Sequence, residues 1–283
     1  MHALFVDNLT VIDFSYFDSK RGIVGESLIL DVKLYGQLND EGMLFDFSFV
    51  KKRIKSCVDN LVDHKLLVAT QQKGVNYTLA HDRLTLNLEC ESGLNYQHIS
   101  PEQAVCFIES TRVTPKSISD KIHKEVLPIL PENVTSLEIA LRPETIDGEY
   151  YHYSHGLKKH LGDCQRIAHG HRSKIEIFVD NQYSQQWTKK IAEVFKDIYL
   201  ATKEDIKDKE TNDKIEYLTF EYHANQGLFQ LTIPSSRCYL INTDTTVELI
   251  ADYLAKYIKE QVGNLKVEVI AYEGVDKGAI AVI

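Results

Sequence analysis

Residues 151–179 read YHYSHGLKKHLGDCQRIAHGHRSKIEIFV, and the rest of the chain can be interpreted from this segment. Its last third alternates, so His169, His171 and Ser173 would share one face of a strand, because side chains repeat every two residues. Two imidazoles at positions i and i+2 then point the same way, about 6–7 Å apart. Residues 151–155 also alternate and would form the paired strand of a hairpin, which adds His155. Three histidines with no fourth protein ligand in reach are typical of a catalytic zinc site, with one position left for water or substrate.

A single thiol accompanies these histidines. Cys164 lies five residues before His169. It would be a fourth ligand, or a nucleophile or base whose pKa the metal lowers. The alternative is a set of ordinary polar residues on a solvated hairpin. Three histidines and a cysteine within seventeen positions favour the metal site.

The order of these residues matches a known pattern. A strand that ends in His, then a Cys, then a His-Gly-His that opens a second strand, resembles the 6-pyruvoyltetrahydropterin synthase / 6-carboxytetrahydropterin synthase family. The resemblance implies the tunnelling fold (T-fold), zinc on His155, His169 and His171, and a proton-transferring thiol at Cys164. The four residues between Cys164 and His169 depart from the three of the commonest bacterial form.

Composition limits the possible partners. The 283 residues suggest one large or two ordinary domains, and the net charge of −9 argues against a nucleic-acid backbone as partner. No apolar run approaches the roughly 20 residues of a membrane helix, and the N-terminus has no signal-peptide pattern. The five cysteines are odd in number and scattered, which fits a reducing cytosol. We therefore expect a cytoplasmic protein that binds neither nucleic acid nor membrane.

The chain repeats one plan twice. Hydrophobic periodicity predicts, in the first half, strands at 9–17, 23–34, 75–90 and 134–141, with helices from about 47 and over 117–130. In the second half it predicts strands at 151–155, 169–179, 215–223, 228–233 and 265–272, with helices over 186–199 and from 245. The charged run 203–214 is predicted to be a mobile, solvated loop.

These elements predict an α+β protein of two tandem T-fold domains, residues 1–147 and 148–283. Each would be a small antiparallel sheet with two helices on one face. T-fold units form barrels by joining several copies edge to edge, so the resemblance implies a homo-oligomer. Closing the ring also removes exposed sheet edges.

The two copies differ in the motifs they keep. The first half has the family's Gly-Met-x-x-Asp-Phe stretch at 42–47, then Asp63-His64, then a strand-end Glu144. It has Val-Gly-Glu at 24–26 in place of His-Gly-His, and we expect Phe17 to stand where His155 should be. The second half has the metal set and Glu273, but 197–199 replaces the Asp-His pair, with Ile198 expected in the place of His64.

This division implies a composite site, because in the family the active site lies between subunits. One half would supply zinc and Cys164, and the other His64, Asp63 and Glu144. Asp63 would support His64, which would carry protons as a general acid–base group. An Asp-His pair taken alone is usually a surface helix end. Whether the two halves meet within one chain or between chains stays open.

The strand-end glutamates suggest how a ring would be held. A pterin presents adjacent N–H donors, and one buried carboxylate accepts two of them side by side. Both Glu144 and Glu273 match the family's position. Which of them holds the pterin is left open, and for either one the alternative is an exposed strand end.

The expected function is that of a zinc-dependent pterin synthase, most like 6-carboxytetrahydropterin synthase of queuosine biosynthesis. The implied substrate is 7,8-dihydroneopterin triphosphate, which would lose triphosphate while zinc binds the side-chain hydroxyls. Lys158, Lys159 and Arg166 would meet the phosphates, or else belong to a solvated loop.

Three alternatives remain. 6-Pyruvoyltetrahydropterin synthase shares the same ligands. A folate-pathway relative would have an altered cysteine position, which the intact Cys164 argues against. A non-catalytic T-fold protein that binds a pterin or purine would tolerate loss of motifs, but random loss would not leave two complementary halves.

Overall fold

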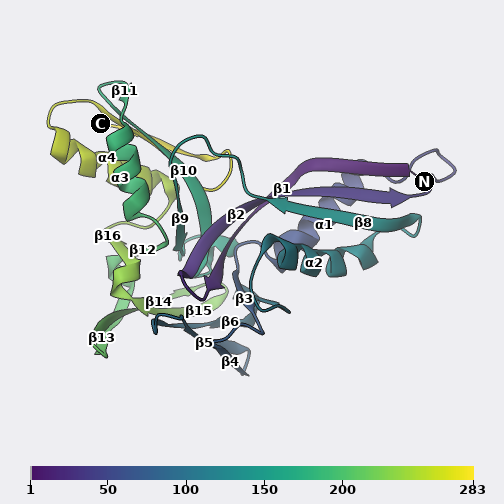
Figure 1. Ribbon diagram of the computed structural model, residues 1–283, viewed down its shortest axis with the longest axis horizontal. Coiled ribbons are helices and arrows are strands. Elements are labelled where there is room, and N and C mark those ends of the chain that lie inside the picture. Colours follow the sequence, from purple (N-terminus) through teal and green to yellow (C-terminus); the bar gives the residue numbers. More distant parts are fainter. Residues whose placement is uncertain (1) are drawn as a thin grey trace.

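The first half forms a mixed sheet with two helices on one face. The computed structural model describes residues 2–283, and for Phe49 only the backbone. The sheet has the order β7-β3-β1-β2-β8, and the helices pack against it (Figure 1). The elements are β1 (His2–Asp18), β2 (Gly22–Gly36), α1 (Phe47–Leu61), β3 (Leu66–Ala69), β7 (Val105–Ile108), α2 (Pro115–Val126) and β8 (Val134–Arg142).

The second half repeats this arrangement at the opposite end of the molecule (Figure 1). Its sheet has the order β16-β12-β9-β10-β17-β18, with β11 paired to β10. The elements are β9 (Tyr150–His155), β10 (His169–Val179), β11 (Gln182–Tyr183), α3 (Gln185–Val194), β12 (Ile198–Thr202), β16 (Cys238–Ile241), α4 (Val247–Val262), β17 (Val267–Tyr272) and β18 (Gly278–Val282).

A third sheet joins the two halves. Its order is β13-β14-β15-β6-β5-β4, and the pairing of β15 with β6 connects second-half strands to first-half strands. The strands are β4 (Val75–Ala80), β5 (Arg83–Glu89), β6 (Asn95–Pro101), β13 (Ile206–Asn212), β14 (Ile215–Ala224) and β15 (Gly227–Pro234). We call it the bridging sheet.

The helices follow from capping and from one apolar face each. Thr114 caps α2 in a capping box with Ser117, and Pro115 occupies the first turn, where its missing N–H costs nothing. Ile118, Ile122 and Val126 are buried on one side of α2. In α4 the cap is Thr246, which accepts from the N–H of Leu249.

Three hydrophobic cores result. One lies under α1 and α2, and one under α3 and α4. The third packs the bridging sheet against strands of both halves, so that Phe17 and Ile23 share a core with Tyr199 and Phe220. Because this core is built from both halves, burial of its apolar surface stabilises their association.

The halves cross at two glycines. The hydroxyls of Ser15 on β1 and Ser154 on β9 lie 2.7 Å apart in a buried hydrogen bond. A Cβ on Gly25 would lie 1.9 Å from the carbonyl oxygen of Tyr153, and one on Gly170 would lie 2.7 Å from the Cα of Gly25. Glycine is required here by close backbone approach.

This crossing relates the two halves residue by residue. Ser15 pairs with Gly25 in one hairpin and Ser154 with Gly170 in the other. The sequence Val-Gly-Glu at 24–26 therefore does occupy the place of His-Gly-His, as predicted. The counterpart of His155 is Tyr16, however, and the predicted Phe17 is wrong by one residue.

The register also corrects the counterpart of His64. His64 and Asp197 both have positive φ, 52° and 57°, and donate their N–H to the carbonyls of Asp13 and His152, which are equivalent on β1 and β9. Asp197 thus stands where His64 stands. The prediction of Ile198 is wrong. In the turn after α3, the residue equivalent to His64 comes one position earlier in the sequence than the comparison of the two repeats predicts.

Several predicted elements differ. The sheets are mixed, because β3 and β7, and likewise β12 and β16, pair in parallel. The 75–90 strand is a hairpin, β4 and β5, turning at His81 and Asp82 with positive φ. The 186–199 helix ends at Val194, and Ile198 begins β12. The charged run 203–214 is largely the edge strand β13, whose charges discourage further strand pairing.

Two features stay predictions: the division of the chain after residue 147 and the closure of several copies into a barrel. Within residues 2–283, no helix is long and apolar enough to cross a membrane.

The crossing point gives a stability test. Gly25→Ala should lower the free energy of unfolding by about 1–3 kcal/mol, because the new methyl meets a backbone carbonyl that cannot move without separating the halves. Gly162→Ala is the matched control, since a Cβ there meets nothing within 4 Å and its φ is −87°. Chemical denaturation measures both. Equal stability of the two variants would contradict the tight crossing.

Candidate active site and metal centre

The three predicted zinc ligands converge. His155 ends β9, and His169 and His171 open β10, where His169 pairs with His155 across the hairpin. One ligand atom from each lies within 4.8 Å of the others, and all three side chains are buried. The side chains of His169 and His171 therefore lie on one face of β10 and converge with His155, as strand periodicity predicts.

Hydrogen bonds fix which nitrogen of each ring is free. Nδ1 of His155 lies 3.0 Å from the Thr245 carbonyl, and Nδ1 of His169 lies 3.0 Å from the Arg166 carbonyl, so each Nδ1–H donates to an oxygen. Nδ1 of His171 lies 3.2 Å from the Asp13 carboxylate. Such outer partners hold the ring and leave Nε2 as the ligand.

The donor set fits a zinc ion. Among the described residues, Nε2 of His155 and both ring nitrogens of His171 are buried without a hydrogen-bond partner, although Nδ1 of His171 lies at ion-pair distance, 3.2 Å, from Asp13. Burial lowers the pKa of His155 and of His169 well below the ordinary value, so both rings are neutral, as metal binding requires. Buried polar atoms without partners are costly, and a bound cation would satisfy them.

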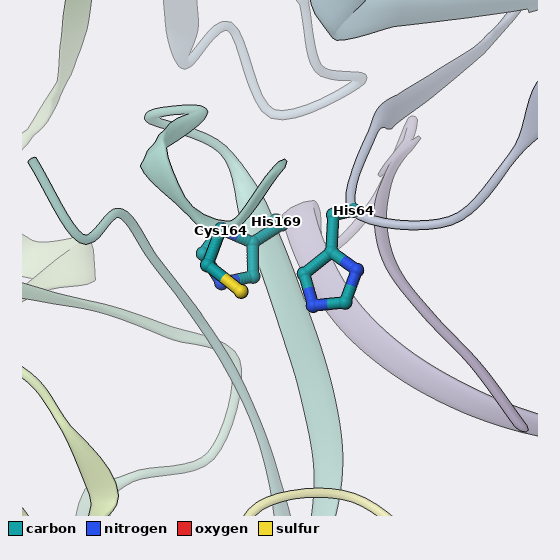
Figure 2. A group of neighbouring side chains, drawn as sticks. All are labelled: His64, Cys164 and His169. Carbon is teal, nitrogen blue, oxygen red and sulfur yellow. The ribbon is translucent and has the colours of Figure 1, made fainter. Parts of the chain in front are cut away.

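A second group brings residues of both halves together. Ligand atoms of His64, Cys164 and His169 all lie within 4.8 Å of one another, and the rings of His64 and His169 are 5.1 Å apart. In Figure 2 the Cys164 sulfur points towards the space beside the His64 ring. The composite arrangement predicted from the repeat thus occurs within one chain.

His64 is held by its neighbours on all sides. It follows α1 in a left-handed turn, and its N–H donates to the Asp13 carbonyl at 2.7 Å. Nδ1 lies 2.6 Å from Oδ2 of Asp63, whose Oδ1 accepts the N–H of Asp13 at 2.8 Å. Burial lowers the pKa of His64, but hydrogen bonding to Asp63 and Cys164 outweighs it and raises the pKa to about 10. The hydrogen bond to Asp63 thus favours the charged form of the His64 ring.

The bridging sheet braces the loop that carries Cys164. The hydroxyl of Tyr222 donates to the Gln165 carbonyl at 2.8 Å, and the N–H of Gln226 donates to Oε1 of Gln165 at 2.6 Å. Gln226 also donates to Asp163 at 2.6 Å. The turn between β14 and β15 therefore fixes both sides of Cys164.

The basic residues near the site already have partners. Arg166 pairs with Asp163 at 2.8 Å and donates to the Asp63 carbonyl at 3.3 Å, which ties the cysteine loop to the His64 turn. Lys158 pairs with Asp205 at 2.5 Å, and Lys159 with Asp244 at 2.6 Å. These ion pairs argue against the predicted role of the three residues as a phosphate-binding site.

The two glutamates lie on different sides. Oε2 of Glu273 is 3.9 Å from Nζ of Lys277, which lies 3.1 Å from Asp13 and so near the His171 side of β10. The carbonyl of Glu144 accepts from Arg172, which alternates with His171 and so faces the other side of β10. The ion pairs of Lys277 thus connect Glu273 with Asp13, whereas the contact described for Glu144 joins its backbone carbonyl to Arg172.

Sequence reasoning missed Asp13. It is buried on β1, and its Oδ1 accepts from Ser27 at 2.5 Å while facing His171. Burial would raise its pKa, but the charges of His171 and Lys277 outweigh this and lower it. The one available signal was an acidic residue inside the otherwise apolar strand sequence Val-Ile-Asp-Phe.

The symmetry-related position in the first half holds an ion pair. Arg21 makes two bonds to Asp197, at 3.0 and 2.5 Å, and donates to the Tyr16 hydroxyl at 3.0 Å. Burial raises the pKa of Glu26, the counterpart of His171, to about 7. Charged and hydroxyl groups that satisfy one another replace the histidine cage there.

Comparisons with known proteins agree with the repeat. The family model of 6-pyruvoyl tetrahydropterin synthase matches residues 13–143 and again 145–281. Two relatives, from Pyrococcus abyssi and Methanocaldococcus jannaschii, carry the name of a candidate 6-carboxy-5,6,7,8-tetrahydropterin synthase. The first is 25% identical over 133 residues, or 47% of this chain and 76% of the relative. The second is 27% identical over 134 residues, or 46% of this chain and 78% of the relative.

Two solved structures are similar to half of the chain. The 6-pyruvoyl tetrahydropterin synthase of Plasmodium falciparum has a TM-score of 0.41 at 16% identity and covers 50% of this chain and 90% of its own. That of Plasmodium vivax has a TM-score of 0.37 at 18% identity and covers 50% and 97%. Neither score is high enough to carry weight. The double match of the family model is decisive: the chain belongs to the 6-pyruvoyl tetrahydropterin synthase family, with two family repeats in one polypeptide.

Proposed function

We propose that this chain is a cytoplasmic, zinc-dependent pterin synthase of the 6-carboxytetrahydropterin synthase type, acting in queuosine biosynthesis. Its substrate would be 7,8-dihydroneopterin triphosphate, which loses triphosphate. One observation supports this above all: three buried imidazoles converge beside a cysteine of the same half and an Asp-supported histidine of the other half. Membership of the family supplies the reaction class.

The metal centre would be His155, His169 and His171, each binding through Nε2. Zinc bound there would act as a Lewis acid, raising the acidity of side-chain hydroxyls and polarising a developing carbonyl. The protein's part is to keep the three rings neutral, buried and fixed by oxygen acceptors on their Nδ1 atoms.

Proton transfer would fall to Cys164 and His64. Loss of triphosphate as an elimination needs a base to take a C–H proton while the C–O bond breaks and its electron pair leaves with the phosphate oxygen. A thiolate at Cys164 is suited to take that proton, and His64 exchanges protons with it, since their side chains are adjacent. Asp63 holds the His64 ring through Nδ1 at 2.6 Å and stabilises its charged form.

Pterin recognition would fall to Glu273, whose carboxylate can accept two ring N–H donors. Its contact with Lys277 at 3.9 Å, and that of Lys277 with Asp13 at 3.1 Å, support this role. The predicted role of Glu144 in the relay stays a prediction. Assembly of several copies into a closed barrel is part of the proposal as well.

The nearest rival is 6-pyruvoyltetrahydropterin synthase, which would use the same ligands. Mass spectrometry of the products formed from 7,8-dihydroneopterin triphosphate distinguishes the two, because a carboxy and a pyruvoyl side chain differ in mass. A non-catalytic pterin-binding protein would have no need for Cys164 beside His64, and it would yield no product at all.

Zinc content is the first test of this function. The purified protein should contain about one zinc per chain, because only the second half has the histidine set. The double variant His169→Ala/His171→Ala should lose it, whereas His223→Ala, an exposed histidine on β14, should keep it. Elemental analysis measures both. Two zinc ions per chain, or zinc retained by the double variant, would contradict the assignment of the metal site to His155, His169 and His171.

The thiol is tested separately from the metal. Cys164→Ala should lower turnover by about 10²–10⁴-fold, since a positioned acid–base group contributes that much, and should keep its zinc because three histidines hold it. Cys57→Ala, on α1, serves as the control and should be as active as wild type. Turnover is followed by triphosphate release and product mass. Full activity of Cys164→Ala would show that another group moves the proton.

The third test concerns the composite site. His64→Ala should lose activity yet bind zinc normally, whereas His171→Ala should lose both. Because the structure joins His64 and Cys164 within one chain, mixing the two variants under conditions of subunit exchange should restore nothing. Recovery of activity in the mixture would instead place the working contact between chains, and an active His64→Ala would refute the composite site.

A further inference from the structure

We propose that Asp13 is a positioning residue of the metal centre, by which the first half of the chain sets the zinc affinity of ligands that all belong to the second half. This rests on the zinc site of the proposed function. Oδ1 of Asp13 lies 3.2 Å from Nδ1 of His171, which is an ion-pair distance, and neither nitrogen of that buried ring has a hydrogen-bond partner among the described residues.

The contacts of Asp13 leave its carboxylate little freedom. Oδ1 accepts from the Ser27 hydroxyl at 2.5 Å, and Oδ2 lies 3.1 Å from Nζ of Lys277. Only 3% of the residue is exposed. A buried carboxylate needs partners that offset its lost hydration, and these two supply them while one edge of Oδ1 faces Nδ1 of His171.

We infer that the position of Asp13 determines the tautomer and the orientation of the third ligand, His171. His155 and His169 donate Nδ1–H to backbone carbonyls of their own half, from Thr245 and Arg166. His171 has a carboxylate of the other half in that place. A carboxylate behind a ligating imidazole fixes the Nδ1–H tautomer, orients the ring and makes Nε2 more basic.

The backbone of the same residue holds the relay. The carbonyl of Asp13 accepts from the N–H of His64 at 2.7 Å, and its N–H donates to Asp63 at 2.8 Å. Asp13 thus contacts both the metal ligand and the acid–base pair. Its side chain and its backbone can be tested apart, because replacing the carboxylate leaves both backbone bonds in place.

The equivalent positions of the other half are occupied differently. His152 replaces Asp13, and Glu26 replaces His171. Nδ1 of His152 lies 2.7 Å from the Gly25 carbonyl and 3.8 Å from Oε2 of Glu26, so its hydrogen bond goes to the backbone and not to the carboxylate. The close approach of a carboxylate to an imidazole of the histidine cage belongs to the pair of Asp13 and His171.

The experiment compares two isosteric changes on one strand. Asp13→Asn should weaken zinc binding by about 10–100-fold in competition with a chelator, the usual effect of removing a carboxylate behind a histidine ligand. Asp7→Asn, an exposed position on β1, should bind zinc as wild type does. The chelator competition needs no pterin, so it is independent of turnover. Unchanged zinc affinity in Asp13→Asn would overturn the inference.

A second measurement applies even if Asp13→Asn does not fold. In metal-free wild-type protein, ¹H–¹⁵N correlation of the imidazole nitrogens should show His171 protonated on Nδ1, and an Nε2–H tautomer there would overturn the inference. Normal zinc binding and the expected tautomer without pterin turnover would leave Asp13 in place and refute the proposed reaction. A wild-type protein that binds no zinc would refute both.

Discussion

The structure depends on the close crossing of two hairpins at Gly25 and Gly170. Backbones approach so tightly there that a methyl group has no room, and the Ser15–Ser154 hydrogen bond closes the contact. The crossing brings the turn after α1 onto the strand that carries the metal ligands. His64 can then contact Cys164 and His169, although about a hundred residues separate it from them in the sequence. Neither hairpin has the whole group of His64, Cys164 and His169, and the close approach of the two glycines is what lets the halves bring it together.

Much of the fold and the metal site could be predicted because the signals are local. His155, His169 and His171 follow strand periodicity, and the helices show apolar faces of period 3.6. The four-residue strands β3 and β7 could not be found, since so short an apolar run carries no period. The composition of the charged strand β13 predicts a loop, because its pairing with β14, rather than its composition, makes it a strand.

The errors in the site have a different cause. The predicted Phe17 and Ile198 each lie one residue away from the true counterparts, Tyr16 and Asp197. Turns of unequal length hide the register until strand pairing shows it. Asp13 was missed because its role arises from contacts with His171 and Lys277, far along the chain. Such long-range polar contacts leave almost no trace in local sequence.

The Arg21–Asp197 ion pair has a consequence for how the protein can change. The place that corresponds to the metal site in the first half is occupied by this partly buried ion pair. Replacing Arg21 would leave Asp197, whose side chain is only 7% exposed, as a buried charge without its partner. Histidines could therefore be introduced there only together with a change at Asp197. The two repeats are different parts of one molecule, and neither can replace the other.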